Sequence, residues 1–220
     1  MSQHLHRAIE GIKQQLLGLS ALVEESLFTA VRAIEERDPA LAKKVIDGDS
    51  LIDHKEVEVE EECLKVLALH QPVATDLRFI VAVLKINNDL ERIGDLAVNI
   101  ANRATAMIKL SPTNKQLVDL QGLPAKVQKM LRKSLDALVN LNGEVAREVM
   151  DADDEVDNIN RSVHKQVISA LKEFPAETER LILYLSVSRN LERIADHTTN
   201  VAEDVLYMIN GVIVRHTKAV

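Results

Sequence analysis

Apolar residues recur along most of this chain at alternating steps of three and four, which is the spacing of one face of an α-helix. One such run comprises Val83, Ile86, Leu90, Ile93, Ala97, Ile100 and Ala104. A second comprises Tyr184, Val187, Leu191, Ile194, Thr198, Val201, Val205 and Met208. Alternation of apolar and polar residues with a period of two is absent. The pattern therefore predicts an all-α fold with the seams of left-handed helical bundles.

Proline and glycine divide these runs into separate helices. Asp38-Pro39 is typical of a helix start, Pro72 and Pro175 interrupt the pattern, and Asn142-Gly143 indicates a turn. The segment 111–114 is the best candidate for a linker. The sequence thus predicts six long helices, at 3–37, 39–70, 73–109, 116–141, 143–173 and 176–210. Helices of this length need packing partners along their whole length.

The chain also contains an internal repeat. Residues 87–101 and 188–202 are identical at seven of fifteen positions, and both contain Leu-Glu-Arg-Ile-x-Asp. Upstream, an acidic stretch at 47–53 aligns with another at 151–157. Because three helices can enclose a core that two cannot, we predict two tandem, sequence-related three-helix bundles, over residues 1–110 and 116–220.

Acidic and amide side chains form matching stripes in the two repeats. They are placed four residues apart, so they share one helix face, and we expect that face to point away from the apolar seam. The candidate residues are Glu91, Asp95 and Asn99 in the first repeat and Glu192, Asp196 and Asn200 in the second. On the preceding helices Asp49, Asp53, Asp153 and Asp157 lie beside the apolar seam.

Two interpretations of these stripes are open. A single Glu-x-x-x-Asp is usually part of a solvated helix surface. Like charges at this spacing are unfavourable, however, and here they recur at equivalent places in both repeats. Clustered carboxylates provide the oxygen ligands that hard cations prefer. We therefore predict metal binding at the bundle surface, with the identity of the metal left open.

The neighbours of the acidic residues have simpler interpretations. Arg92 and Arg193 are expected to form ion pairs on the helix surface rather than to bind phosphate. His197 is expected to be solvated or hydrogen-bonded rather than a metal ligand, and its counterpart is Leu96. The chain lacks a Gly-rich phosphate loop, a nucleophile elbow and a His-Glu-x-x-His motif. These observations favour a binding protein over an enzyme.

Composition narrows the possible partners and location. Apolar residues make up 46% of the chain but aromatic residues only 2%, so Leu, Ile, Val and Ala must build the core. The net charge of −7 disfavours direct binding to nucleic acid. Cys63 is the only cysteine, which suits a reducing compartment. The N-terminus lacks the apolar stretch of a signal peptide, and the longest apolar run, 79–84, is too short for membrane insertion. We expect a cytoplasmic protein.

The repeated motif resembles that of the PhoU family, whose mark is a Glu/Asp-x-x-x-Asp motif in each of two three-helix bundles. Here the motif is Glu91/Asp95 in the first repeat and Glu192/Asp196 in the second. The segment 67–78 resembles the turn between the second and third helices of that family, and the similarity covers essentially the whole chain. Leu96 stands where the motif often has His, and Thr198-Thr199 replace Ala-Val of the first repeat.

The resemblance implies a function that composition and spacing do not. By this resemblance, we expect the chain to act as an adaptor between a phosphate-specific ABC transporter and a sensor histidine kinase. We also expect it to repress the phosphate-starvation response and to form a homodimer, as PhoU proteins often do. By resemblance, the four motif carboxylates would ligate iron, manganese, magnesium or zinc, with the helix-two and helix-five aspartates as weaker candidates. The expected partners are the transporter's ATPase subunit and the kinase. The alternatives are a metal-dependent phosphate-ester hydrolase and a metal-free helical scaffold.

Overall fold

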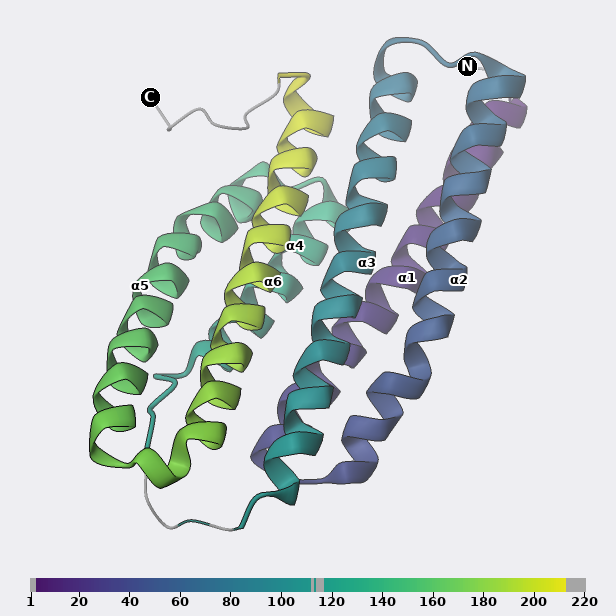
Figure 1. The fold of residues 1–220 in the computed structure, drawn as a ribbon. Helices are drawn as coiled ribbons and strands as arrows, with labels where there is room; N and C mark the ends of the chain where they lie inside the picture. Colours follow the sequence, from purple (N-terminus) through teal and green to yellow (C-terminus); the bar gives the residue numbers. More distant parts are fainter. Residues whose placement is uncertain (1–2, 112, 114–116, 213–220) are drawn as a thin grey trace.

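A computed structural model describes residues 3–111, 113 and 117–212, and these residues form six α-helices and one short 3-10 helix (Figure 1). In chain order the elements are α1 (Gln3–Glu35), α2 (Pro39–His70), α3 (Ala74–Lys109), α4 (Leu123–Asn140), α5 (Gly143–Glu173), η1 (Pro175–Glu177) and α6 (Thr178–Asn210). None of the described residues is in a strand. Nor do they include a helix with the length and apolar character to cross a membrane. The prediction of an all-α fold is confirmed.

Most helix ends follow the local signals in the sequence. The Asp38 side chain accepts a hydrogen bond from the backbone N–H of Ala40 at 2.7 Å, and Pro39 occupies the first position of α2. The Asn142 side chain accepts hydrogen bonds from the first backbone N–H groups of α5. Such caps satisfy donors that a helix leaves unpaired at its start. At the other end of α1, Arg37 adopts a left-handed conformation with φ of 52°, so this helix ends at Glu35 rather than at residue 37.

The predicted start of the fourth helix, at residue 116, is wrong. Residue 116 lies outside the described residues, and α4 begins only at Leu123, after Gly122 with φ of 72°. The preceding segment is held by Gln166 of α5, whose side chain accepts from the Asp119 N–H at 2.8 Å and donates to the Asp119 carbonyl at 3.1 Å. Leu117 is buried there without being helical.

Two further boundaries differ from the prediction or fall outside the description. The sixth helix begins at Thr178, because the turn from Pro175 to Glu177 is a 3-10 helix. Of the predicted linker at 111–114, only Ser111 and Thr113 are described. The carbonyl of Ser111 accepts a hydrogen bond from the guanidinium of Arg180, which ties this end of the first repeat to the start of α6.

The helices form two three-helix bundles side by side, as predicted. Helices α1, α2 and α3 pack on one another, and so do α4, α5 and α6. Figure 1 shows α3 and α6 running antiparallel along the middle of the molecule, with α1 and α4 behind them and α2 and α5 at the two outer edges. The second bundle is therefore turned roughly upside down relative to the first.

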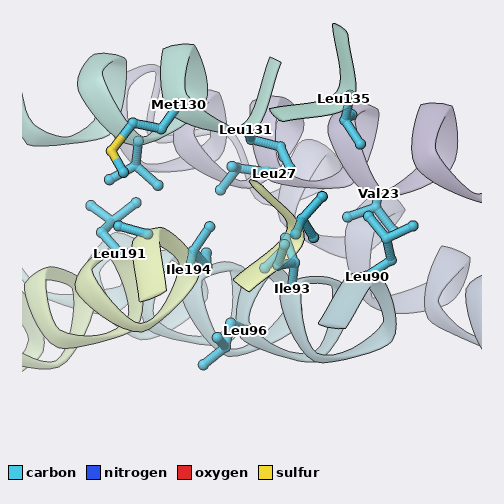
Figure 2. Close-up of a cluster of buried hydrophobic side chains, with 14 of the residues drawn as sticks. Val23, Leu27, Leu90, Ile93, Leu96, Met130, Leu131, Leu135, Leu191 and Ile194 are labelled. Carbon is cyan, nitrogen blue, oxygen red and sulfur yellow. The ribbon is translucent and has the colours of Figure 1, made fainter. Parts of the chain in front are cut away.

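One hydrophobic core runs through both bundles. Figure 2 shows side chains of α1, α3, α4 and α6 meeting in a single cluster, and the labelled members on these helices include Leu27, Leu90, Ile93, Leu131, Leu191 and Ile194. All six are fully buried. The apolar residues of α3 and α6 recur at steps of three and four. These two helices pack on the helices of their own repeat and also on each other, across the boundary between the repeats.

Polar contacts along α3 and α6 show that the repeats are related by a pseudo-two-fold axis. The Lys85 ammonium lies 3.2 Å from the Asp204 carboxylate, and the Arg103 guanidinium donates to the Ser186 hydroxyl at 3.0 Å. The alignment that pairs residue 91 with 192 also pairs 85 with 186 and 103 with 204. The two contacts are thus equivalent, one at each end of the α3–α6 seam, with different chemistry in each.

Positions that the axis relates also differ in how they pack in the core of each repeat. A Cβ atom at Gly94 would lie 3.2 Å from Cγ2 of Ile52, which is closer than ordinary van der Waals contact. The equivalent positions in the second repeat carry Ala195 and Val156, both buried. A smaller residue on one helix is therefore accompanied by a larger residue on the other.

We expect Gly94→Ala and Ile52→Val to compensate for one another. Ala gains up to about 1 kcal/mol of helix propensity, but the crowding costs ~1–3 kcal/mol. Ile→Val alone costs ~0.5–1.5 kcal/mol. In urea unfolding, the free energy of unfolding of the double variant should exceed the additive expectation by at least ~0.5 kcal/mol. Additive effects would show that Ile52 moves aside without cost.

Candidate metal-binding faces

The first candidate site lies where α2 and α3 pack side by side, halfway along both helices. It comprises Asp49, Asp53 and Glu56 of α2 and Glu91 and Asp95 of α3, and is called here the repeat-one acidic face. Burial, then the charges of Asp53 and Asp95, raise the pKa of Asp49. Because Asp95 belongs to the other helix, the carboxylates of α2 and α3 are close enough to repel one another.

Glu91 is the most enclosed carboxylate of the α3 motif. Its side chain is 22% exposed, compared with 41% for Asp95. Burial is the main cause that raises the pKa of Glu91, followed by the charge of Asp95. The Arg92 guanidinium lowers this pKa, whereas the charges of Asp53 and Glu56 on α2 raise it further. The acids therefore lie outside the apolar core, as expected, but both are partly covered by the protein rather than fully solvated.

The second candidate site occupies the equivalent place where α5 and α6 pack side by side. It comprises Asp153, Asp157, Glu192 and Asp196, and is called here the repeat-two acidic face. Burial first, and then the charges of the other three carboxylates, raise the pKa of Asp196 to about 6. Burial and the charge of Asp157 also raise the pKa of Asp153, whereas an interaction with the Thr199 hydroxyl opposes this shift.

The two motif asparagines have different surroundings. Asn99 is exposed on α3, one turn beyond Asp95. Asn200 instead donates a hydrogen bond to Asp89 Oδ1 at 3.1 Å, so its amide is engaged in the α3–α6 seam. The two residues are identical in the repeat, yet only Asn200 has a carboxylate across the seam, because the position equivalent to Asp89 is Asn190.

The residues next to the motif carboxylates also have different contacts in the two repeats. Arg92 lies 3.2 Å from the Asp95 carboxylate and 3.4 Å from that of Glu91, which is the predicted surface ion pair. Within the part of the chain that the structure describes, Arg193 makes no such pair with Glu192 or Asp196. His197 Nδ1 lies 2.8 Å from Asp89 Oδ1, so this histidine is hydrogen-bonded, as expected, and tied to the first repeat.

Two oxygen atoms of the repeat-one acidic face lack the partners that buried polar atoms normally have. Asp49 Oδ1 and Glu91 Oε2 are buried and accept no hydrogen bond among the described residues. Glu91 Oε2 is within ion-pair distance of Arg92 but without hydrogen-bond geometry. Orphaned oxygens among mutually repelling carboxylates are a donor set that fits a hard cation.

The side chains are not, however, arranged around a metal position as they stand. In residues 3–111, 113 and 117–212, no three His, Cys, Asp or Glu side chains are gathered closely enough to hold a metal ion. Ligation at either face therefore requires rotation of side chains about the helix surface. The half-exposed Asp95 and Asp157 have the room for this movement.

Glu56 is a member of the repeat-one acidic face that the repeat alone does not indicate. Burial, followed by the charges of Glu60 and Asp53, raises the pKa of Glu56. Its Oε1 accepts a hydrogen bond from the Asn87 amide at 3.0 Å. The signal for it was the helical spacing from Asp49 and Asp53, but the equivalent residue of the second repeat is Asn160, so the duplication hides it.

Comparison with known proteins agrees with this architecture. The family model described as the PhoU domain matches residues 16–104 and 122–205. The chain is 34% identical over 216 residues to a protein of Pseudomonas aeruginosa named phosphate-specific transport system accessory protein PhoU homolog, covering 98% of this chain and 89% of that protein. A protein of the same name from Aquifex aeolicus is 36% identical over 212 residues, with 96% of each chain covered.

Two solved structures have the same fold. The crystal structure of PhoU from Pseudomonas aeruginosa superposes with a TM-score of 0.91 at 33% identity, covering 94% of this chain and 99% of that one. The phosphate transport system regulatory protein PhoU from Streptococcus pneumoniae superposes with a TM-score of 0.86 at 26% identity, covering 95% and 98%. The match of both repeats, the shared fold and the relatives at more than 30% identity lead to one conclusion: this chain belongs to the PhoU family.

Proposed function

We propose that this protein regulates phosphate uptake and phosphate-starvation signalling as a metal-binding adaptor in the cytoplasm, between a phosphate ABC transporter and a sensor histidine kinase. Its relatives are named as accessory or regulatory proteins of phosphate transport, not as enzymes, which supports the regulatory role. The transporter's ATPase subunit and the kinase are the proposed partners, and the protein is proposed to act as a homodimer. Iron, manganese, magnesium and zinc are the candidate metals.

The observation that carries this proposal is the crowding of carboxylates at equivalent places in both repeats, where Arg92 and Arg161 balance the negative charge only in part. Each acidic face brings carboxylates of two helices together, and their pKa values are raised by burial and by one another. Elsewhere on the surface, exposed carboxylates pair with cations, as Glu36 does with Arg32 and Asp47 does with Lys43. A bound cation would neutralise the acidic faces and change the surface that a partner meets.

Metal binding is tested first by calorimetry on chelator-treated protein. Titration with Mn²⁺ or Fe²⁺ should give saturable binding that Glu91→Gln/Asp95→Asn weakens at least tenfold at one class of site, because two ligating charges are lost (about 1.4 kcal/mol per tenfold). Asp136→Asn/Glu173→Gln is the matched control, since it removes two exposed charges outside both faces. Equal weakening by both double variants would reduce the effect to net charge and contradict a metal site.

Adaptor function is tested separately, with the purified ATPase subunit of a phosphate ABC transporter. Surface plasmon resonance should show binding in the presence of the metal that calorimetry selects, and a loss of at least about tenfold in affinity after chelation. The quadruple variant that neutralises Glu91, Asp95, Glu192 and Asp196 tests whether metal at the faces is responsible. Unchanged affinity with and without metal would refute the link between the faces and the partner, while leaving metal binding itself intact.

A further inference from the structure

The exposed side of α6 in the second repeat carries arginines that form no ion pair with the described residues. A surface depression of ≈350 Å³ is lined by Ile182, Leu185, Ser186, Arg189, Asn190 and Arg193. Arg103 of α3 reaches its edge, where its guanidinium donates to the Ser186 hydroxyl at 3.0 Å. In Figure 1 this region is the lower, green half of α6 beside the lower end of α3.

None of these three arginines forms an ion pair with a carboxylate of the described chain, although about half of its described lysines and arginines do. Arg32, Arg132, Arg161 and Arg180 all pair with Asp or Glu. Arg189 and Arg193 are both exposed and are four residues apart, so they share one face of α6. No carboxylate lines the depression. Three guanidiniums without an ion pair favour an anionic ligand.

The first repeat shows that this arrangement does not follow from the motif itself. Arg92, the equivalent of Arg193, is occupied by Glu91 and Asp95. The position equivalent to Arg189 is Asn88, and the equivalent seam contact is Lys85 neutralised by the buried Asp204. The cationic surface therefore belongs to the second repeat alone, and it adjoins the repeat-two acidic face, because Asp196 follows Arg193 by three residues on α6.

The shape and the apolar end of the depression indicate the kind of ligand. Its lining residues span about three turns of α6, or ~16 Å, which is too long for a single small oxyanion. Ile182, 54% exposed, and Leu185 form one end, and the arginines form the other. An apolar side chain followed by carboxylates one to two turns later would complement both ends.

We propose that this α6 surface binds an acidic amphipathic segment of a partner protein, with an apolar side chain on Ile182 and Leu185 and its carboxylates on Arg189, Arg193 and Arg103. The proposal rests on the arginines and on the apolar end of the depression, and it does not require a metal at the acidic faces. Binding of this kind is strengthened by charge and is therefore weakened by salt.

The test uses the full chain and a fluorescein-labelled synthetic helical peptide of about four turns, with Leu on its first turn and Glu on the following turns. Fluorescence anisotropy should show saturable binding that weakens with added salt. Arg189→Glu/Arg193→Glu should weaken it at least about tenfold, whereas Arg7→Glu/Arg147→Glu, which makes the same charge change at exposed positions elsewhere, should leave it within about twofold. Ile182→Ser should weaken it about threefold or more, which tests the apolar anchor.

Three outcomes would overturn the proposal. The first is no binding of the peptide to the wild-type chain, and the second is equal weakening by the two charge-reversal variants. The third is a site that millimolar inorganic phosphate saturates while Ile182→Ser and removal of the peptide's Leu have no effect, since that result would assign a small-anion site. Repeating the titration with chelator must leave the affinity unchanged, which separates this result from the fate of the metal proposal.

Discussion

Asp196→Asn is expected to stabilise the metal-free protein at neutral pH by ~1 kcal/mol and to destabilise it relative to wild type when metal is present. The pKa of Asp196 is raised to about 6 in the folded protein, above the value near 4 of an unfolded chain. The folded state therefore holds its proton more tightly, so this carboxyl favours folding below about pH 4, and that contribution is lost as the pH rises through about 6. Asn does not ionise and avoids the loss. The gain is limited to ~1 kcal/mol because Asp196 is exposed to water, which screens its charge.

The sign of the effect reverses when a cation binds. A metal that binds only the folded state adds about 2.7 kcal/mol of stability at a hundred times its dissociation constant, and the variant loses a ligand for it. Urea unfolding followed by circular dichroism, with chelator or with Mn²⁺, measures both situations. Asp136→Asn is the control, because it is exposed outside the faces and should change stability by less than ~0.5 kcal/mol. Destabilisation of the chelated variant at neutral pH would contradict the charge crowding, and stabilisation in both conditions would contradict metal binding.

The sequence predicted the helices well because helix formation here depends on local spacing. The apolar positions of α3 and α6 that recur at steps of three and four, from Val83 to Ala104 and from Val187 to Met208, are all buried. The prediction failed at α4, where apolar residues continue the pattern before the helix starts. There Gly122 takes a left-handed conformation and Gln166 captures the backbone of Asp119, a contact between distant parts of the chain.

The parts of the candidate sites that depend on contacts within one repeat could be predicted from the sequence, whereas contacts between the two repeats could not. Each acidic face is formed by two helices of the same repeat, α2 with α3 and α5 with α6. The carboxylates of each face therefore come together within one repeat. Residues that meet the other repeat could not be assigned in this way. Asn99 and Asn200 are identical in the motif, but Asn200 is bound by Asp89 of the other repeat. Local sequence cannot specify which helix covers such a side chain.

The same reasoning explains why Arg92 and Arg193 differ. Both follow a motif glutamate and precede a motif aspartate by three residues, so helix geometry allows each the same ion pair. Only Arg92 makes it. Arg193 lies beside a seam in which Arg103 and Ser186 replace the Asp204 and Lys85 of the other end. The pseudo-two-fold axis preserves the fold while the chemistry of its two ends diverges, and the structure thereby gives the two repeats different surfaces.

The continuous core leads to the second large prediction: Ile93→Ala should lower the free energy of unfolding by ~2–5 kcal/mol and destabilise both repeats together. Ile93 is fully buried in the cluster that α1, α3, α4 and α6 share (Figure 2). Removing its side chain leaves a cavity that neighbours on both repeats can fill only in part. The equivalent residue of the second repeat is Ile194, which is also fully buried, and Ile194→Ala is expected to have the same effect.

The measurement needs a separate probe in each repeat, and the chain has no Trp of its own. Leu67→Trp reports on the first repeat and Tyr184→Trp on the second, since both side chains are half-buried, on α2 and α6, and α2 packs only on α1 and α3 among the described elements. In urea, the two probes should report the same midpoint, and Ile93→Ala should shift both midpoints equally, because one core unfolds in one transition. Leu64→Ala, at a side chain that is 52% exposed on α2, should change stability by less than ~0.5 kcal/mol. If Ile93→Ala moves the first midpoint and leaves the second in place, the two repeats unfold as independent domains and the shared core does not couple them.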